Sequence, residues 1–442
     1  MTDTAITDVF AWEAFDSRGR PTVAARVHLA GGAVGRAIAP SGASTGTHEA
    51  TELRDGGDRY GGAGVLAAVG HARGELFDAV RGLDAADQQG VDAAMEVADG
   101  TADLGRLGAN AVLAVSLAAM LAAADATRAP LYEVLADGAE PLIPMPMVNI
   151  LSGGLHAAGA LDIQDVLVVP VGAGSFAEAI EWATRVREHA ARLVTARGGT
   201  AHLVADEGGL AAGLDTNRDA IALVTDAITA AGYRPGDQVG IAIDCAANQF
   251  AQAAGRYRLA CENRVLDTDQ WLAELDSWCR DFPILSIEDP LAEDDWAGWT
   301  AATALLGSDR QLLGDDLFVT NTARLAHGQN LGAGNAVLVK PNQAGTVSRA
   351  ARVVRQAQAA GYGTVVSARS GDTEDTWLAD LAVGWRAGQI KVGSTMRSER
   401  TAKWNRLLEI EAELGAAARF AGRQALAGTR AAGAAAPATT DS

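Results

Sequence analysis

Residues 335–345 read NAVLVKPNQAG, and this stretch decides the fold because it brings an apolar run to an end on a lysine. Residues 336–339 are rich in β-branched side chains and have the length of a strand buried on both faces, which Pro341 cannot continue. Lys340 is therefore predicted at the carboxyl end of a strand, the edge of an α/β sheet where ligands bind. A partly desolvated amine there can have its pKa lowered enough to act as a base. The alternative is a lysine that extends into solvent, and only its neighbours can distinguish the two.

The chain of 442 residues is long enough for one barrel-sized domain and a smaller one. Hydrophobic residues make up 48% and charged residues 21%, which indicates a folded globular protein. The formal net charge of −19 argues against nucleic acid or an anionic membrane as a partner, so an anionic substrate needs a local cationic pocket. Residues 1–10 lack the basic and apolar segments of a secretory signal, so we expect a cytoplasmic protein.

The longest apolar run, residues 111–124, is shorter than the ~20 residues of a membrane span, so we expect a buried helix and no membrane segment. The three cysteines, Cys245, Cys261 and Cys279, have no CxxC spacing. They predict neither a disulfide framework nor a zinc site.

Residues 1–135 are predicted to form an α+β capping domain. Residues 6–30 alternate as strands do, around the turn DSRGRPT at 16–22. Residues 40–55, PSGASTGTHEATELRD, have the small side chains and glycines of a mobile loop, for which a plain linker is the alternative interpretation. Apolar residues then recur at helical spacing over residues 64–135.

Residues 136–415 are predicted to form a (β/α)8-type barrel. Two strands, at 147–151 and 166–171, precede two helices, at 176–197 and 220–231, so the first units are irregular. Strands and helices then alternate, as repeated βαβ units of a parallel barrel do. The last polar residues of the later strands are Asp244, Glu288, Asp315, Lys340, Ser367 and Lys391, and with the two early strands the count is eight. Residues 416–442 are predicted to be a helix end and a flexible tail.

Asp244, Glu288 and Asp315 end three consecutive strands, so their carboxylates are expected to meet at one rim of the barrel. A single strand-end carboxylate more often caps the next helix, but three hard oxygen ligands in register favour Mg²⁺. Lys340 and Lys391 end later strands, and a neighbouring metal lowers the proton affinity of an ammonium group by like-charge repulsion. This arrangement suits removal of a proton next to a carboxylate and stabilisation of the resulting dianion.

From about residue 8 to residue 414 the chain resembles the enolase family. The motifs that carry the resemblance are FDSRGRPTV, PSGASTGTHEATELRD, LGANAVLAVSLA, ADEGG, SIEDPLAEDDW, GDDLFVTN, KPNQAGT, RSGDTEDTWLADLAVG and RSERTAKWNRLLEIEAEL. The resemblance implies an enolase-kind barrel with a capping domain. It also implies a Mg²⁺-dependent lyase that converts 2-phosphoglycerate to phosphoenolpyruvate, and a homodimer or higher homo-oligomer.

The resemblance also implies roles for single residues. Lys340 would take the C2 proton, Glu207 would assist departure of the C3 hydroxyl, and Ser44 would help to bind a second Mg²⁺. The first Mg²⁺ would be held by Asp244, Glu288 and Asp315. The implied substrate contacts are His156, Gln164, Asp165, Glu288, Asp315, Arg369, Ser370 and Lys391, among which Arg369 and Ser370 grip the phosphate and Lys391 clamps the carboxylate.

Three positions depart from the family pattern. Asp165 stands where a glutamate is usual, Ala368 where a histidine is usual, and Leu155 where serine is common. A carboxylate misplaced by about 1 Å can lower a rate on the order of 10²-fold. Asp165 and Ala368 are expected near Glu207, so proton abstraction is predicted to be preserved and hydroxide loss altered.

Three hypotheses follow for the function. The first is a phosphopyruvate hydratase, in which the departures are drift. The second is a specialised homologue acting on a phosphonate analogue, such as a carboxyphosphonoenolpyruvate synthase of phosphinothricin-type antibiotic biosynthesis. The third is a non-catalytic binding role on an enolase scaffold. The expected partner is a small phosphorylated or phosphonate carboxylic acid substrate.

Overall fold

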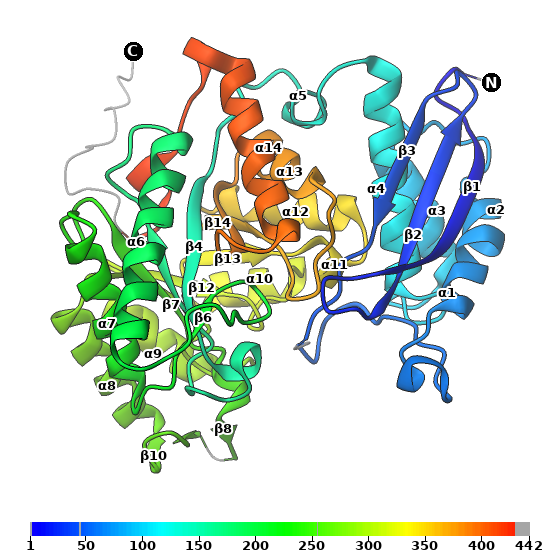
Figure 1. Cartoon of the computed structure of the whole chain (residues 1–442). Coiled ribbons are helices and arrows are strands. Elements are labelled where there is room, and N and C mark those ends of the chain that lie inside the picture. The colour runs from blue at the N-terminus through cyan, green and yellow to red at the C-terminus, as the bar shows by residue number, and fades with distance from the viewer. Residues whose placement is uncertain (1, 44–45, 254, 429–442) are drawn as a thin grey trace, which may run out of the picture.

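The computed structural model describes residues 2–43, 46–253 and 255–428. In this part of the chain an N-terminal domain, blue to cyan in Figure 1, lies beside a larger barrel domain, green to red. The predicted architecture, an enolase-kind barrel with an N-terminal α+β cap, is confirmed.

The N-terminal domain is built on a three-stranded antiparallel sheet, β1 (Ile6–Phe15), β2 (Pro21–Leu29) and β3 (Val34–Ile38). Asp16 forms the predicted β1–β2 turn, because its carboxylate accepts the backbone N–H groups of Arg18 at 2.8 Å and Arg20 at 2.9 Å. The other elements of this domain are η1 (Arg59–Gly62), α1 (Leu66–His71), η2 (Ala72–Leu76), α2 (Phe77–Val80), α3 (Gln88–Asp99), α4 (Ala109–Thr127) and α5 (Leu131–Ala136).

Helix α4 is the buried helix that the apolar run predicted. It packs against β2 and β3. By length and composition it is the one described helix that could cross a membrane, but 78% of its apolar window is buried inside the protein. The core of the N-terminal domain therefore accounts for its hydrophobicity.

The barrel domain contains eight strands closed by the pairing of β15 with β4. In order around the barrel they are β4 (Met145–Ser152), β5 (Asp165–Val169), β7 (Gly240–Asp244), β11 (Ile284–Glu288), β12 (Gln311–Gly314), β13 (Ala336–Val339), β14 (Gly363–Ser367) and β15 (Gly388–Gly393). Helices surround these strands, and apolar side chains such as those of Met147, Leu313 and Leu338 form a core cluster on them.

The remaining elements of the barrel domain are helices and short strands in its connections. The helices are α6 (Phe176–Ala196), α7 (Asn217–Ala230), α8 (Thr268–Asp281), α9 (Trp296–Leu306), α10 (Thr322–Leu331), α11 (Pro341–Ala344), α12 (Val347–Ala359), α13 (Trp377–Gly384) and α14 (Ser398–Leu414). The short elements are η3 (Gly154–Ala157), β6 (Leu210–Ala211), η4 (Ala247–Gln249), β8 (Ala251–Gln252), β9 (Arg256–Leu259) and β10 (Arg264–Asp267).

Strand β5 runs antiparallel to both of its neighbours, β4 and β7. The connection from β4 carries only the short turn η3 instead of a crossover helix, so the chain returns along the barrel in the opposite direction. As a result, the first residue of β5, Asp165, lies opposite the last residue of β7, Asp244. A residue at the start of a strand thereby reaches the same rim as the other strand ends.

The C-terminal segment closes the opposite end of the barrel. Helix α14 ends at Leu414, and η5 (Gly415–Ala417) and η6 (Gly422–Ala425) follow it. Leu426 is fully buried in the cluster that fills the barrel. The predicted flexible tail falls mainly on residues 429–442, which lie outside the described residues.

Candidate active site

The predicted strand-end residues converge at one rim of the barrel. Asp244 and Glu288 are partners in the β7–β11 pairing, and Asp315 follows the end of β12. Lys340 follows β13, and Pro341 ends the strand by starting α11. The structure therefore brings together the three carboxylates and the lysine that the sequence placed at strand ends.

Lys391, within β15, joins two of these carboxylates. Its Nζ lies 2.7 Å from Asp244 Oδ2 and 2.7 Å from Glu288 Oε2, and all three side chains are at most 7% exposed. Burial lowers the pKa of the Lys391 ammonium, but Asp244 and Glu288 outweigh it and hold the pKa well above its ordinary value. Lys391 is therefore a permanent positive charge, which suits binding of a carboxylate.

Lys340 forms an ion pair with Asp315. Burial lowers the pKa of Lys340, but the Asp315 carboxylate outweighs it, so the pKa lies above its ordinary value. The directly contacting carboxylate stabilises the ammonium form, and a divalent cation on Asp315 would offset that stabilisation. The sequence predicts a lowered pKa for a lysine beside a bound metal, so for the metal-bound site it stays a prediction.

The carboxylates fit a hard cation. Asp244 Oδ1 is buried, and it has no hydrogen-bond partner within the described residues. Such an oxygen is costly to bury unless a cation or water meets it. Among the described residues, Asp315 lies in a compact group of carboxylates with Asp289 and Asp316. Asp244 and Glu288 instead form ion pairs with Lys391.

Asp289 is a residue that the sequence analysis did not single out. Its carboxylate accepts the backbone N–H groups of Asp315 at 2.9 Å and Asp316 at 2.7 Å. These bonds orient the loop after β12 and hence the Asp315 carboxylate. The signal was available in the motif SIEDP, where Asp289 directly follows Glu288.

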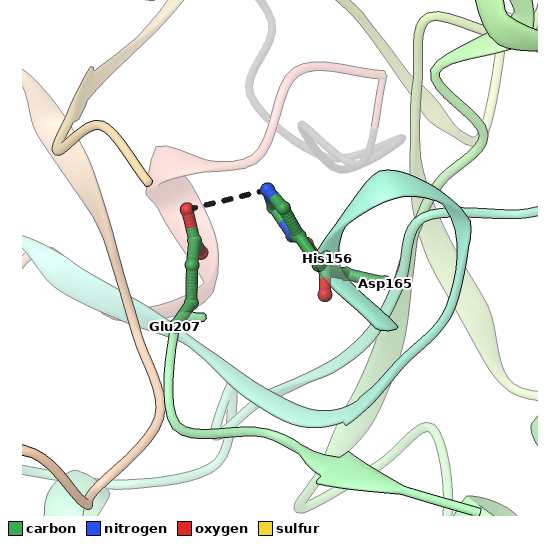
Figure 2. A group of neighbouring side chains, drawn as sticks. All are labelled: His156, Asp165 and Glu207. Atoms are coloured by element: carbon green, nitrogen blue, oxygen red, sulfur yellow. Dashed lines mark hydrogen bonds and ion pairs between the residues drawn. The ribbon is translucent and has the colours of Figure 1, made fainter. Parts of the chain in front are cut away.

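A second group at the rim contains His156, Asp165 and Glu207 (Figure 2). His156 Nδ1 lies 2.9 Å from Asp165 Oδ2, and its Nε2 lies 3.8 Å from Glu207 Oε1. Burial lowers the pKa of His156, but Asp165 and Glu207 outweigh it and raise the pKa to about 9. His156 is therefore an imidazolium at neutral pH, placed between two carboxylates.

The other oxygen of Asp165 is also engaged. Oδ1 accepts hydrogen bonds from Ser152 Oγ, at 2.8 Å, and from the Asn149 side-chain amide. Gln164 instead reaches across the rim, where its Nε2 donates to Asp244 Oδ2 at 3.2 Å. Asp165 thus contacts His156, which in turn lies beside Glu207.

Ala368 lies at the end of β14 beside β15, where its backbone N–H donates to the Lys391 carbonyl oxygen at 2.9 Å. Its side chain is 5% exposed. A methyl group therefore occupies a buried rim position, at which the resemblance to the enolase family implies a histidine. It offers neither a proton nor a hydrogen bond to the site.

The raised pKa of His156 predicts a pH-dependent contribution to stability. The folded-state pKa of about 9 exceeds the ordinary value of 6.5, so the stabilisation is complete below about pH 6.5 and is lost as pH rises through 9. Its size is about 3 kcal/mol. Urea unfolding of wild type and His156→Gln between pH 6 and 10 should show this slope in the wild type alone, and parallel curves would contradict it.

Two glycines let Glu207 reach the rim. Gly208 has a φ of 83°, and a Cβ on Gly209 would lie 2.5 Å from Ser152 Oγ and 2.8 Å from Asn149 Oδ1. The backbone after Glu207 thus packs directly onto the residues that hold Asp165. This close approach explains why two glycines follow Glu207 in the ADEGG motif.

Gly209→Ala is expected to destabilise the protein by about 1–3 kcal/mol, because a methyl group would overlap Ser152 and Asn149. Gly213→Ala is the matched control, since a Cβ there meets nothing within 4 Å. Thermal unfolding of the two variants measures the difference. Equal melting temperatures would show that the backbone at Gly209 can relax.

The predicted anion binders lie on the loop after β14. Arg369 is paired with Glu49, and Ser370 Oγ accepts the backbone N–H of Ala43 at 2.6 Å. Arg400 supports both positions, because its guanidinium donates to the carbonyl oxygens of Arg369 at 2.7 Å and Ser370 at 2.6 Å. Ser44, the predicted ligand of a second Mg²⁺, lies outside the described residues.

Gln343 is a second residue that the sequence analysis did not single out. Its Nε2 donates to Asp315 Oδ1 at 2.8 Å and to Glu49 Oε1 at 3.3 Å, and its Oε1 accepts from Thr320 Oγ1 at 2.7 Å. The Thr320 hydroxyl in turn accepts the N–H of Lys340 at 2.9 Å. The motif KPNQAG contained the residue, but its contact with Glu49 depends on the capping domain.

Two family models match the chain. One, described as the enolase N-terminal domain, covers residues 6–135, and the other, the enolase C-terminal TIM barrel domain, covers residues 140–429. The capped barrel and its rim of buried carboxylates and lysines define a lyase of the enolase superfamily. Within that superfamily, the chain belongs to the enolase family.

Proposed function

We propose that this protein is a Mg²⁺-dependent lyase that removes the C2 proton of 2-phosphoglycerate and expels water to give phosphoenolpyruvate. The observation that carries the proposal is the pair of buried lysines, Lys340 and Lys391, each in contact with carboxylates at the rim. Charged groups this deeply buried are costly, and they concentrate at functional sites.

Asp244, Glu288 and Asp315 would hold the Mg²⁺. When bound, the ion would neutralise the charge that develops on the substrate carboxylate as the proton leaves. Enolases typically use Mg²⁺, and the unpartnered Asp244 oxygen supports such a site here. Ser44 would supply a ligand to a second ion.

Each residue of the site would have its own role in the reaction. Lys391 binds the substrate carboxylate, and Lys340 takes the C2 proton in its neutral form. Arg369 and Ser370 bind the phosphate, and Glu207 carries the proton that leaves with the C3 hydroxyl. His156 holds Glu207 and contacts the substrate together with Gln164, while Asp165 keeps His156 charged.

A phosphonate analogue as substrate is the second candidate, as in a carboxyphosphonoenolpyruvate synthase. Two observations favour it. Ala368 places a buried methyl group where the resemblance implies an imidazole. Both carboxylate oxygens of Asp165 form hydrogen bonds with other side chains of the protein. These changes affect the side of the site from which the hydroxyl departs. A non-catalytic binding role on an enolase scaffold is least supported, because it does not explain the buried lysines and carboxylates at the rim.

The deciding experiment supplies purified protein with Mg²⁺ and 2-phosphoglycerate and follows enol absorbance. An increase that depends on both supports the first function. No turnover while Mg²⁺ still binds, measured by calorimetry, would overturn it. A product formed only when CMP-phosphonoformate is supplied would establish the second.

Ala368→His tests what the missing imidazole means. If this position limits hydroxide loss, the variant should turn over 2-phosphoglycerate faster by on the order of 10²-fold. Steady-state kinetics of wild type and variant measure the ratio. An unchanged rate would show that the alanine is neutral for this substrate.

We also propose a cytoplasmic homodimer or higher homo-oligomer that binds neither nucleic acid nor membranes. The oligomer is what the resemblance to the enolase family implies, and the net charge of −19 supports the absence of nucleic acid. Light scattering tests the first statement, and a shift assay with DNA and RNA tests the second.

A further inference from the structure

Glu49, in the loop between the N-terminal sheet and α1, lies against the guanidinium group of Arg369. Arg369 Nη1 donates to Glu49 Oε2 at 2.8 Å, and Nη2 donates to Oε1 at 3.3 Å. The side chain of Glu49 is 6% exposed and that of Arg369 is 3% exposed. The carboxylate therefore occupies one N–H of each terminal nitrogen of Arg369, the residue to which the proposed function assigns the substrate's anionic group.

A carboxylate and a phosphate use the same fork of a guanidinium group, since both offer two oxygens to two parallel N–H groups. Two anions cannot occupy that one fork of N–H groups at the same time, and at a buried position they would repel each other strongly. A phosphate group that binds the same fork of Arg369 must therefore displace Glu49.

The surroundings of Glu49 allow it to leave. Apart from Arg369, its carboxylate accepts the N–H of Gly46 at 2.9 Å and a longer bond from Gln343 Nε2 at 3.3 Å. Glu49 also lines a cavity of about 650 Å³ whose walls include Arg352 and Arg349, of which Arg349 is paired with Glu96. A released carboxylate has space on that side, with Arg352 in the cavity wall.

We propose that Glu49 is a built-in competitor of the substrate at Arg369. Its carboxylate neutralises the buried guanidinium until a phosphate or phosphonate group replaces it, so it sets the affinity of the site for that group. The inference rests on the proposed function only in the role of Arg369. Glu49 is a positioning residue, because it acts on the substrate through Arg369.

Glu49→Gln tests the inference, because it keeps the length of the side chain and removes the competing charge. Calorimetry of the full-length protein with Mg²⁺ and inorganic phosphate should give a Kd lower by on the order of tenfold. With 2-phosphoglycerate, KM should fall without a matching rise in kcat. A Kd equal to or higher than that of the wild type would overturn the inference, since a purely supporting role predicts weaker binding.

Glu293→Gln is the matched control. Glu293 contacts the same loop through Thr47, whose hydroxyl donates to its Oε1 at 2.6 Å, and it is not a partner of Arg369 in any described contact. The Glu293→Gln substitution removes one negative charge beside the loop, so the Kd of this variant for phosphate should equal that of the wild type. Equal tightening in both variants would mean that net charge, and not displacement of Glu49, sets the affinity.

Two more variants separate the possible failures. Arg369→Ala should abolish phosphate binding, and wild-type binding in that variant would overturn the anion site of the proposed function itself. If Arg369→Ala abolishes binding and Glu49→Gln does not tighten it, only the present inference fails. Should Glu49→Gln not fold, Glu49→Asp retains the charge but withdraws it by one methylene, and it must still lower the phosphate Kd.

Discussion

Lys340→Ala is expected to lower kcat by on the order of 10²–10⁴-fold, because the variant lacks the amine that accepts the C2 proton. Lys340 follows the end of β13 and forms an ion pair with Asp315. No other lysine among the described residues forms an ion pair with Asp315, so none can replace the lost amine. The loss should appear with 2-phosphoglycerate and with a phosphonate analogue alike, since both require the same proton to leave. Steady-state kinetics measure it.

Exchange of the C2 hydrogen with solvent deuterium separates this role from the rest of the reaction. Lys340→Ala should lose the exchange, whereas Glu207→Gln should retain it and lose elimination. Lys340→Arg is the matched control, because arginine preserves the charge next to Asp315 but stays protonated at neutral pH. Turnover near the wild-type level in either Lys340 variant would exclude this lysine as the base.

Lys391→Met is expected to destabilise the protein by about 3–5 kcal/mol when Mg²⁺ is removed with EDTA. The variant leaves Asp244 and Glu288 buried without the ammonium that lies 2.7 Å from each of them. If the same carboxylates bind Mg²⁺, the added ion should restore much of the loss, because a ligand of the folded state stabilises it by mass action. Urea unfolding with EDTA and with Mg²⁺ measures both effects.

Lys403→Met provides the comparison. Lys403 is a buried lysine paired with Asp372, at 2.5 Å, and neither residue belongs to the proposed metal site. Its loss should destabilise the protein to a similar extent, with no additional benefit from Mg²⁺. If Mg²⁺ rescues both variants equally, the ion acts somewhere other than on Asp244 and Glu288.

The strand ends of the site were predictable from sequence. Each apolar run has the length of a buried strand and ends on Asp244, Glu288, Asp315 or Lys340, so the alternation of strands and helices predicted both the barrel and its charged rim. Asp165 did not obey that rule, because it begins an antiparallel strand. Only the family resemblance pointed to it.

What each ionisable group contacts was not predictable. The sequence predicts a lowered pKa for Lys340 beside a bound metal, but it does not show that the Asp315 carboxylate contacts Lys340 and raises its pKa when no metal is bound. His156 is charged because Asp165 and Glu207 lie on either side of it. The balance of burial and neighbouring charge depends on distances between side chains, and no pattern along the chain contains those distances.

The sequence by itself determined the barrel, the capping domain, and the residues that stand at the ends of the barrel strands, because strand length, helical spacing and turn residues are local properties. The tertiary structure alone decided which of those charges meet. Glu49 reaches Arg369 across 320 positions, and Lys391 reaches Asp244 across 147. These pairs form because packing the cap onto the barrel, and closing the barrel itself, removes the charges from water, and a buried charge is stabilised by an opposite charge beside it.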